Sequence, residues 1–584
     1  MSRNQELATI FAQMGDVLDL LGENAFKINA HRRVARALED MAEDAAALAV
    51  SDPDALRAMP GFGAATVKKI KEFAELGKVP EHQELLAQVP AGLLQVLQIP
   101  GLGPKRVRAL WQDGGVVDVA SLKAKIADGS LAKLKGMGAK TLQNALESLE
   151  YLERSAGRAR LGQAMPVAEA LVAFLQRVKG VKHIGYAGSL RRGRETIGDV
   201  DIVASARYPA HVHQALQEAP GVTKVLAAGE TKTSVRMDTG LQVDLRTVSD
   251  AEYGAALLYF TGSKEHNIRL RERAQQRGLR LNEYGLFPDD GEAAPQDRGI
   301  NPIAAATEED VYAALELPWI PPELREDHGE LGSPPPKGLV SIADIKADLH
   351  SHTNASDGAL TIEGMADEAI RRGLKVLAIT DHSRSSAQAN GLTTERLLDH
   401  ISLIRSIARQ YKDQITLLAG SEVDILADGS LDYPDEILAQ LDVVVASPHS
   451  SLKAAPEVAT ERLLKAIRHP LVHIIGHPTG RIINAREGLS PDIALLARES
   501  KAHNTALEIN ANTMRLDLRD AHVRVCVDTG TLISINTDAH AAADFDQLRY
   551  GVTTARRGWL TTSLCVNAWE PKALLDWLKS KRPG

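Results

Sequence analysis

The 584-residue sequence predicts a multidomain protein with helical domains at the N-terminus, an α+β part in the middle and an α/β barrel at the C-terminus. The chain is too long for a single hydrophobic core, so several domains are expected. Three observations predict these classes. Two glycine-rich turns separate helical segments in the first third, two aspartates share an apparent strand in the middle, and short apolar runs ending in histidines or carboxylates recur from about residue 343 onward.

The composition argues against a secreted or membrane protein. No apolar segment is long enough to cross a membrane, and the first residues, MSRNQELATIF, read directly as an amphipathic helix. The cysteines, Cys526 and Cys565, form no recognisable disulfide framework and are interpreted as free thiols of a reducing cytoplasm. The net charge of -8 is mildly acidic, so nucleic-acid binding would have to come from local basic surfaces.

The first third of the chain repeats a turn of the form apolar-Pro-Gly-x-Gly. It occurs at residues 58–71 and 97–108, and a poorer copy lies at 134–142. A glycine turn that opens a helix presents free backbone N–H groups to phosphate oxygens. Helix-capping glycines with solvated lysines are the alternative, and for a single copy that reading is the better one. Two good copies favour a grip on DNA phosphates that does not read sequence. The residues predicted to form it are Gly61, Gly63, Lys68, Gly101, Gly103, Lys105 and Arg106.

The middle of the chain places three carboxylates on two apparent strands. Asp199 and Asp201 are spaced i, i+2 in GDVDIV, so their side chains share one face, and Asp244 lies in LQVDLRTV. Converging carboxylates repel one another strongly even at an effective dielectric constant of about 20, so they imply divalent cations between them. Oxygen-only ligation suits Mg²⁺ or Mn²⁺, which also takes ligands from substrate phosphates. The chemistry that this supports is nucleotidyl transfer by two metal ions.

Around these carboxylates the sequence resembles the nucleotidyltransferase palm of family X DNA polymerases, the group of DNA polymerase beta. The resemblance rests on the turn at Gly188-Ser189, on the arginines that follow it, on GDVD, and on LLYFTGSKEHN, and it covers roughly residues 1–320. It implies that Asp199, Asp201 and Asp244 are catalytic metal ligands and that Asp244 activates a 3′-hydroxyl. Implied nucleotide contacts are Gly188, Ser189, Arg192, Gly198, Tyr259, Phe260, Gly262 and Asn267, and Arg271 is an implied template contact.

Two positions depart from vertebrate members of that family. Lys264 replaces an aspartate near the base, and Gln242 replaces an arginine beside the third aspartate, but neither change removes a metal ligand. The glycine turns resemble helix-hairpin-helix elements, and Lys69 matches the lysine that forms a Schiff base with an abasic sugar in DNA polymerase beta. This implies a 5′-deoxyribose phosphate lyase, although the same lysine cluster also fits a plain phosphate grip.

Nine metal-type side chains stand at the ends of short apolar runs in the last part of the chain. Side chains at i and i+2 of a strand share a face, so several of them come in pairs that offer two ligands to one site. Strand ends that all present ligands describe the catalytic rim of a barrel of alternating strands and helices. A lone histidine there would more often be a core or surface residue, but here the placement repeats. The nine are His350, His352, Asp357, His382, Glu422, His449, His477, Asp538 and His540.

The chemistry of this set restricts the metal and the family. Imidazoles and carboxylates without a thiolate favour Zn²⁺, Mn²⁺ or Fe, and nine ligands indicate two or three ions, which can activate water against a phosphoester. The motifs HSH, TDH, GHP and DAH, in this order, resemble a PHP (polymerase and histidinol phosphatase) domain over roughly Ala343–Lys579. The resemblance implies a distorted (βα)7-type barrel with 3′–5′ exonuclease activity, extended to 3′-phosphatase and abasic-site endonuclease activity.

Prolines concentrate at residues 321–338, where they cannot continue a helix or a central strand, and they mark the clearest linker. The predicted organisation is two helix-hairpin-helix domains, a palm, a thumb, a Pro-rich linker and a PHP domain. Their predicted ranges are 1–85, 86–155, 156–262, 263–320, 321–342 and 343–584.

The predicted function is a DNA-directed DNA polymerase that fills short gaps in base excision repair, joined to a metal-dependent phosphoesterase that processes 3′ ends. Expected cofactors are Mg²⁺ or Mn²⁺ at the palm and two or three Mn²⁺, Zn²⁺ or Fe ions at the barrel. Expected partners are gapped or 3′-ended duplex DNA, bound without sequence preference, and deoxynucleoside triphosphates, and the chain is expected to be a cytoplasmic monomer. Two alternatives stay open: a PHP domain that is only a structural brace, and a small-molecule phosphatase of the histidinol phosphatase kind fused to a DNA-binding module.

Overall fold

The computed structural model describes residues 3–41, 44–59, 62–97, 99, 102–134, 137–138, 141–143, 145–146, 149, 157–290 and 295–581. The chain forms two compact units. One consists of Met1–Ala156 with Asn484–Arg486, and the other of Gly157–Ile483 with Glu487–Gly584.

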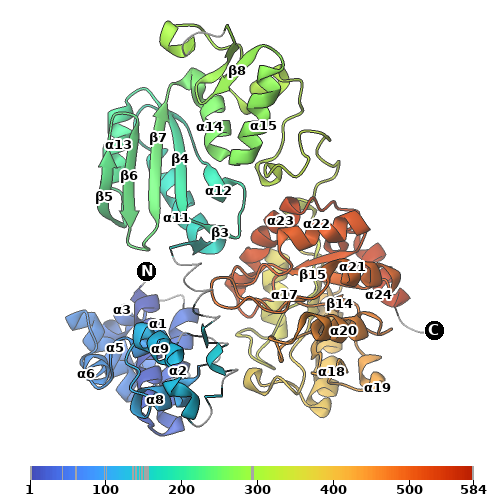
Figure 1. Cartoon of the computed structure of the whole chain (residues 1–584). Coiled ribbons are helices and arrows are strands. Elements are labelled where there is room, and N and C mark those ends of the chain that lie inside the picture. Colours follow the sequence, from blue (N-terminus) through green and yellow to red (C-terminus); the bar gives the residue numbers. More distant parts are fainter. Residues whose placement is uncertain are drawn as a thin grey trace. The chain divides into compact units, whose positions relative to one another are not determined.

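The described part of the first unit is helical (Figure 1). Its helices are α1 (Arg3–Leu21), α2 (Ala25–Asp40), α3 (Ala45–Ser51), α4 (Pro53–Ala58), α5 (Ala64–Leu76), α6 (Pro80–Leu86), α7 (Leu93–Leu97), α8 (Pro104–Gln112) and α9 (Val119–Ala127). Apolar side chains at helical spacing on α1, such as Leu7, Phe11 and Met14, are buried in the core of the unit. Gly63 is the N-cap of α5 and Gly103 that of α8, and neither offers a side-chain cap, so the first N–H groups of both helices point outward.

The second unit begins with the α+β domain of the predicted palm. Its elements are β1 (Ala159–Arg160), α11 (Leu161–Leu175), β2 (Val181–Tyr186), α12 (Gly188–Arg191), β3 (Thr196–Ile197), β4 (Asp199–Ala206), α13 (Pro209–Gln217), β5 (Val222–Ala228), β6 (Lys232–Met237) and β7 (Gln242–Val248). The five-stranded sheet has the order β2-β4-β7-β6-β5, in which β4 and β7 are parallel and the other neighbours antiparallel (Figure 1). Val200, Ile202 and Val243 are buried with residues of α11 and α13, so the alternate positions, which include the aspartates, face the other side.

The predicted thumb follows the palm. Helix α14 (Tyr253–Thr261) is the last element within the predicted palm range, and the predicted thumb contains α15 (Lys264–Gln275), β8 (Leu279–Asn282), β9 (Gly285–Pro288) and α16 (Glu308–Ala314). Helix α14 packs on β4 of the palm through Ala256, which meets Val203 and Ala187, and its other buried residues join the core of the thumb. The corner between palm and thumb is therefore a packed one.

The first part of the predicted Pro-rich linker belongs to the thumb. Arg325 is fully buried and donates to Glu308 at 2.7 and 3.0 Å. Glu330 is 2% exposed, and its Oε1 lies 2.7 Å from His266 Nδ1. The charges are buried because each has a partner. Sequence patterning missed this, since prolines and charges in this segment resemble those of a solvated spacer.

The barrel is built from seven parallel strands in chain order. They are β10 (Ala347–Asp348), β11 (Val376–Ile379), β12 (Thr416–Asp424), β13 (Val443–Ser447), β14 (Ile474–Ile475), β15 (Ala506–Asn510) and β16 (Ile533–Asn536). The helices of this domain are α17 (Ile362–Arg371), α18 (Thr394–Tyr411), α19 (Asp435–Leu438), α20 (Pro456–Ile467), α21 (Ile493–Ala502), α22 (Asp520–Thr529), α23 (Leu548–Arg557) and α24 (Pro571–Ser580).

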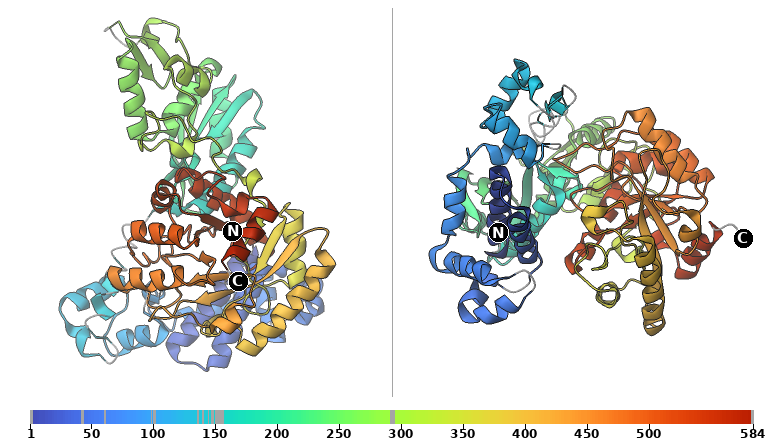
Figure 2. Two further views of the ribbon diagram at one scale, coloured as in Figure 1. Left: turned by 90° about the vertical axis from the view of Figure 1, so that its right-hand side faces the viewer. Right: turned by 90° about the horizontal axis from the view of Figure 1, so that it is seen from below.

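The seven strands nearly close on themselves. A parallel bridge between Ser351 and Ala539 joins the two ends of the sheet. Leu377 belongs to a cluster beneath the surrounding helices, whereas its neighbour Ala378 belongs to an inner cluster that Trp577 of α24 completes. Figure 2 shows the helices of this domain around its strands. The predicted fold class is confirmed: helical front, α+β palm and thumb, and α/β barrel. Across the described ranges, no helix combines the length and the apolarity that a membrane crossing requires.

We expect Gly254→Ala to destabilise the thumb. Gly254 lies in the first turn of α14, and a Cβ there would stand 2.3 Å from Thr307 Cα. Because backbone would have to move, the free energy of unfolding should fall by about 1–3 kcal/mol, the usual range for overpacking. Denaturant unfolding followed by fluorescence of Trp319, which donates to Glu308 at 3.1 Å, would measure the change. Gly332→Ala is the matched control, since the nearest contact of a Cβ there is 3.6 Å away; equal shifts in both variants would contradict the expectation.

Candidate active sites

The three predicted aspartates of the palm lie together where β4 and β7 begin. Asp199 and Asp201 are the first and third residues of β4, and the parallel register places Asp201 directly beside Asp244. Paired residues in neighbouring strands share a face of the sheet. Asp244 is 6% exposed, Asp201 is half-buried and Asp199 is exposed. The predicted carboxylates are thus brought together at a site that opens to solvent on one side.

Burial and mutual repulsion set the charges of this triad. Burial raises the pKa of Asp201 to about 6, with further contributions from Asp199 and Asp244. Burial alone would also raise the pKa of Asp244, but hydrogen bonds, first of all from Lys232, outweigh it and lower that pKa. Lys232 Nζ lies 2.6 Å from Asp244 Oδ2, and Gln242 Nε2 donates to Oδ1 at 3.0 Å. The raised pKa of Asp201 reflects in part the negative charge of the neighbouring carboxylates. A cluster of negatively charged oxygen ligands suits Mg²⁺ or Mn²⁺.

The predicted phosphate turn runs beside the triad. Gly188 has φ +63°, and a Cβ at this position would lie 2.3 Å from Asp201 Oδ2, so only glycine fits here. Ser189 follows it in the short helix α12. Gly198 directly precedes Asp199 and leaves 3.1 Å between a hypothetical Cβ and Arg158 Nη1. The structure therefore brings these glycines to the triad, while their contacts with a nucleotide stay a prediction.

The guanidinium of Arg192 already has partners within the protein. Its Nε lies 3.0 Å from Glu326 Oε1, and its Nη1 donates to the carbonyl oxygen of Thr261. Gly262 adjoins this contact at φ +69°, with 3.1 Å between a hypothetical Cβ and Arg192 Nη1. A triphosphate bound by Arg192 would have to take the place of Glu326.

The remaining predicted nucleotide contacts gather where α14 meets α15. The rings of Tyr259 and Phe260 lie edge to face at 5.2 Å, and Asn267 Nδ2 donates to the carbonyl oxygen of Tyr259 at 2.7 Å. Arg271 lines a small hollow together with Tyr259 and Asn267. Phe260 connects this corner to the triad, because the guanidinium of Arg246, two residues beyond the third aspartate, stacks on its ring at 4.4 Å.

The described residues of the glycine turns lie at the surface of the helical unit. A Cβ at Gly63 or Gly103 would meet nothing within 4 Å, and the side chain of Lys68 is 79% exposed. Lys105 and Arg106 are exposed as well. Gly61 and Gly101 lie outside the described residues. This placement suits a phosphate grip, which stays a prediction.

Lys69 differs from Lys68 and Lys71 because its side chain is largely buried and its ion pair is closer. Its Nζ lies 3.0 Å from Glu81 Oε2, and only 12% of its side chain is exposed. A Schiff base would require the amine of Lys69 to be free of its carboxylate partner. Lyase chemistry at Lys69 would therefore begin with separation of this pair.

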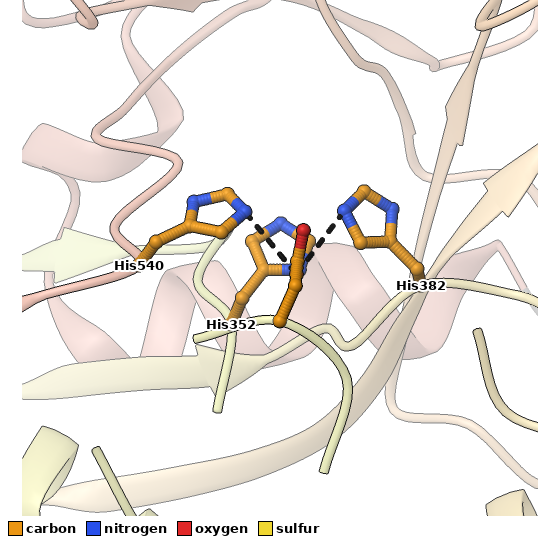
Figure 3. A group of neighbouring side chains, drawn as sticks. His352, His382 and His540 are labelled. Carbon is orange, nitrogen blue, oxygen red and sulfur yellow. Dashed lines mark ion pairs between the residues drawn. The ribbon is translucent and has the colours of Figure 1, made fainter. Parts of the chain in front are cut away.

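All nine predicted barrel ligands converge at one end of the barrel. His477 Nε2 lies 2.9 Å from Glu422 Oε1, and Figure 3 shows the rings of His352, His382 and His540 gathered around a common space. Three overlapping groups have ligand atoms within 4.8 Å of one another: His352, Asp357, His382 and His540; His350, His352 and Asp538; and His382, Glu422 and His449.

Many of these ligand atoms are buried without a hydrogen-bond partner. They include both carboxylate oxygens of Glu422, both ring nitrogens of His352 and His477, and Nε2 of His350. Buried polar atoms are normally satisfied, so a cluster of unsatisfied ones fits the ligand set of a cation. The donor set of imidazoles and carboxylates fits two or three ions such as Zn²⁺, Mn²⁺ or Fe.

Metal binding requires ionised carboxylates and neutral imidazoles. The carboxylates of the barrel meet this condition, but neighbouring carboxylates outweigh burial and raise the pKa of His449 to about 10 and that of His540 to about 9, so a bound cation would displace protons from these rings. Burial would raise the pKa of Glu422, but His449 and His350 outweigh it and hold that pKa well below its usual value. Burial would also raise the pKa of Asp538, but neighbouring histidines, above all His350, outweigh it and hold that pKa well below its usual value. Burial lowers the pKa of His352 to about 4.

Two carboxylates that the sequence analysis did not select orient the histidines. Glu508 of β15 lies 2.8 Å from His350 Nδ1 and accepts from the backbone N–H of His477 at 2.7 Å. Asp424, at the end of β12, holds Nδ1 of His449. Such contacts leave Nε2 facing the metal. Each of these acids has a weak sequence signal: Glu508 lies within the apolar strand ALEIN, and Asp424 lies two residues after the ligand Glu422. Neither pattern indicates which histidine ring the carboxylate contacts.

The fold and the two sites define a class of protein. A family X DNA polymerase with a PHP domain has four such parts: glycine turns that open helices, an α+β palm with three aspartates on neighbouring strands, a thumb, and a barrel with clustered histidines and carboxylates at one end. The chain has all four. Comparisons with protein families agree. Residues 2–79 match a helix-hairpin-helix domain, 93–150 a SAM-like helix-hairpin-helix tandem, 256–326 the DNA polymerase beta thumb, and 348–512 the PHP domain.

Comparison with whole proteins gives the same result. The chain is 38% identical over 566 residues to the DNA polymerase/3′-5′ exonuclease PolX of Bacillus subtilis (strain 168). The matched region covers 96% of this chain and 97% of that protein. The chain therefore belongs to the PolX family of DNA polymerases, and both the predicted resemblance and the predicted enzyme class are confirmed. Shorter relatives are probable phosphatases, 28% identical over 247 residues in Thermoanaerobacter sp. (strain X514) and 30% over 243 in Syntrophotalea carbinolica. They match 40% and 39% of this chain, and 95% and 94% of their own length.

We expect Glu508→Gln to weaken metal binding by the barrel about 10–100-fold, the range for groups that orient metal ligands. Glu508 accepts from His350, from the backbone of His477, and from Asn536 at 2.8 Å, and an amide offers only one acceptor oxygen for these contacts. Elemental analysis after dialysis against a series of chelator concentrations measures the metal retained. Glu499→Gln, which disrupts an ion pair with Arg468 at the surface, is the control; equal metal loss in both variants would refute the role of Glu508.

We expect the palm to bind Mn²⁺ more tightly as the pH rises from about 5 to 7. Because burial raises the pKa of Asp201 to about 6, protons compete with the cation below that pH. The apparent affinity should fall about tenfold for each pH unit below 6 and level off above about 7, since one pKa unit corresponds to ~1.4 kcal/mol. The Mn²⁺ concentration for half-maximal primer extension measures this, and a flat profile across the range would rule the expectation out.

Proposed function

We propose that the palm fills short gaps during DNA repair of the base excision type, and that the barrel hydrolyses phosphoesters at 3′ ends. The observation that carries the polymerase assignment is the register that places Asp201 beside Asp244, with Asp199 on the same face. The name of the Bacillus subtilis relative, which combines polymerase and 3′-5′ exonuclease, supports the pairing of the two activities.

Each residue of the palm has a defined part in this proposal. Divalent cations bound at the palm would lower the pKa of the attacking 3′-hydroxyl and neutralise the triphosphate. Cations bound in the barrel would activate water instead. Asp244 would receive the hydroxyl proton, the role that the resemblance to family X polymerases implies for it, and its lowered pKa keeps it ionised. Asp199 and Asp201 would bind the nucleotide side of the site next to the turn at Gly188, and Arg192 would exchange Glu326 for a phosphate oxygen.

The barrel would hold two or three Mn²⁺, Zn²⁺ or Fe ions through its nine ligands. Glu508 and Asp424 keep His350 and His449 in the orientation that presents Nε2. Relatives named as probable phosphatases favour phosphomonoester hydrolysis as an addition to exonuclease activity, that is, a 3′-phosphatase, and abasic-site cleavage needs the same attack on a diester. A structural brace would gain nothing from buried ligand atoms without partners, so the orphaned atoms of Glu422 favour a catalytic centre.

The two modules serve one substrate in this proposal. A blocked or mispaired 3′ end cannot be extended, and hydrolysis by the barrel makes it extendable by the palm. The exposed Lys68, Lys105 and Arg106 beside open glycine turns would hold the DNA backbone without reading sequence. Lyase activity of Lys69, the domain ranges and a monomeric state stay predictions.

Asp244→Ala should abolish extension and spare hydrolysis, and His350→Ala should do the reverse. A metal ligand supplies several kcal/mol of transition-state stabilisation, which at ~1.4 kcal/mol per tenfold is about a thousandfold in rate. The assay is a 5′-labelled primer in a short gap with Mn²⁺, with and without deoxynucleotides. The extended product measures polymerase activity of the palm. A descending ladder of shortened primers in the absence of nucleotides measures hydrolysis by the barrel.

Matched controls for that assay are Asp238→Ala and His503→Ala, which change exposed residues of the same types in the same two domains. Both should extend and degrade the primer normally. Normal extension by Asp244→Ala would mean that the palm assignment is wrong, and joint loss of both activities in His350→Ala would indicate a structural metal site.

A further inference from the structure

Lys232 forms an ion pair with the palm triad. It is the first residue of β6, and the register pairs it with Arg246 and pairs Ser234 with Asp244. Lys232 therefore reaches Asp244 diagonally across the same face of the sheet, with 2.6 Å between Nζ and Oδ2. Within the described ranges, it is the one cationic side chain that forms an ion pair with an aspartate of the triad.

The pair combines a buried and a partly exposed partner. The side chain of Asp244 is 9% exposed, whereas that of Lys232 is 38% exposed. A lysine ammonium is a compact charge on a flexible four-carbon stem, so it can leave the carboxylate for water without rearrangement of the sheet. Gln242, the other side-chain donor on β7, carries no charge and cannot replace it.

A divalent cation and the ammonium compete for the same oxygen. A cation held by the triad would need lone pairs of the Asp244 carboxylate that the ammonium now occupies, and like charges at contact distance repel one another strongly near a protein surface. Three carboxylates without any cation would also repel one another. The triad therefore needs positive charge in either state. In the metal-free state Lys232 supplies it at Asp244, while Arg246 lowers the pKa of Asp201.

We propose that Lys232 is the resident counter-ion of the triad, and that entry of the divalent cation displaces its ammonium toward solvent. The inference rests on the proposed function of the triad as a metal site. Lys232 is a positioning residue and not a metal ligand: it holds Asp244 in place for the cation and, by competition, sets the concentration of cation at which the palm fills.

The test is Mn²⁺ binding by the DNA-free full-length protein, with free Mn²⁺ measured by electron paramagnetic resonance. Because the barrel also binds metal, each variant is titrated with and without Asp244→Asn, and the difference between the two isotherms isolates the palm. Lys232→Met and Lys232→Gln should bind Mn²⁺ at the palm about tenfold more tightly than the unchanged protein, equivalent to ~1.4 kcal/mol. Lys232→Arg, which keeps the charge, should stay within about twofold.

Lys224→Met is the matched control, since Lys224 is an exposed lysine of the neighbouring strand β5. It removes the same charge without touching an aspartate, and it should leave the palm isotherm unchanged. Unaltered affinity in both Lys232→Met and Lys232→Gln, or equal tightening in Lys224→Met, overturns the inference while leaving the metal site intact. If Asp244→Asn removes no Mn²⁺ from the unchanged protein, the proposed metal site itself is wrong, and the inference falls with it.

A second readout is independent of metal counting. In excess chelator, Lys232→Met should unfold at a lower temperature than the unchanged protein, because Asp244 has lost the ammonium that pairs with it. Saturating Mn²⁺ should remove that difference, since the metal then neutralises the triad in both proteins. A difference that persists in saturating Mn²⁺ would assign Lys232 to general stability and overturn the inference.

Discussion

Repulsion between like charges held close together and partly out of water is the constraint on which both sites depend. It is strong because the protein interior screens charge poorly. The palm gathers Asp199, Asp201 and Asp244 at the start of two parallel strands, and the barrel gathers nine ligands at one end of its sheet. Strand register holds the groups together, because backbone hydrogen bonds and apolar packing elsewhere in each sheet outweigh the local repulsion.

The two sites meet this constraint in different ways. The palm uses carboxylates alone, keeps one side open to solvent and sets the ammonium of Lys232 against Asp244. The barrel alternates imidazoles with carboxylates and backs them with buried acids such as Glu508 and Asp424. Oxygen ligands at a solvent-open edge suit a cation that arrives with each nucleotide, whereas buried mixed ligands with fixed orientation suit ions that remain bound.

A buried ionic network couples the nucleotide side of the palm to the thumb. Arg191 of the palm and Arg325 of the thumb both bind Glu308, at 2.6 and 2.7 Å. Burial would raise the pKa of Glu308, but the two arginines outweigh it and lower the pKa to about 2. Removal of one partner would leave a buried charge uncompensated, so the turn that carries Arg192 and the thumb are held in a fixed relation.

The sequence by itself determined the fold classes, and it selected the three aspartates and the nine barrel side chains that the structure brings together. The reason is that strand periodicity, glycine turns and motif order are local patterns that a chain carries before it folds. Only the tertiary structure decided the pairing of Lys232 with Asp244, the contact of Glu508 with His350, and the burial of Arg325 in a segment that looked like a spacer. These contacts join residues on different strands or distant segments, and which of them meet depends on register and packing, which no local pattern specifies.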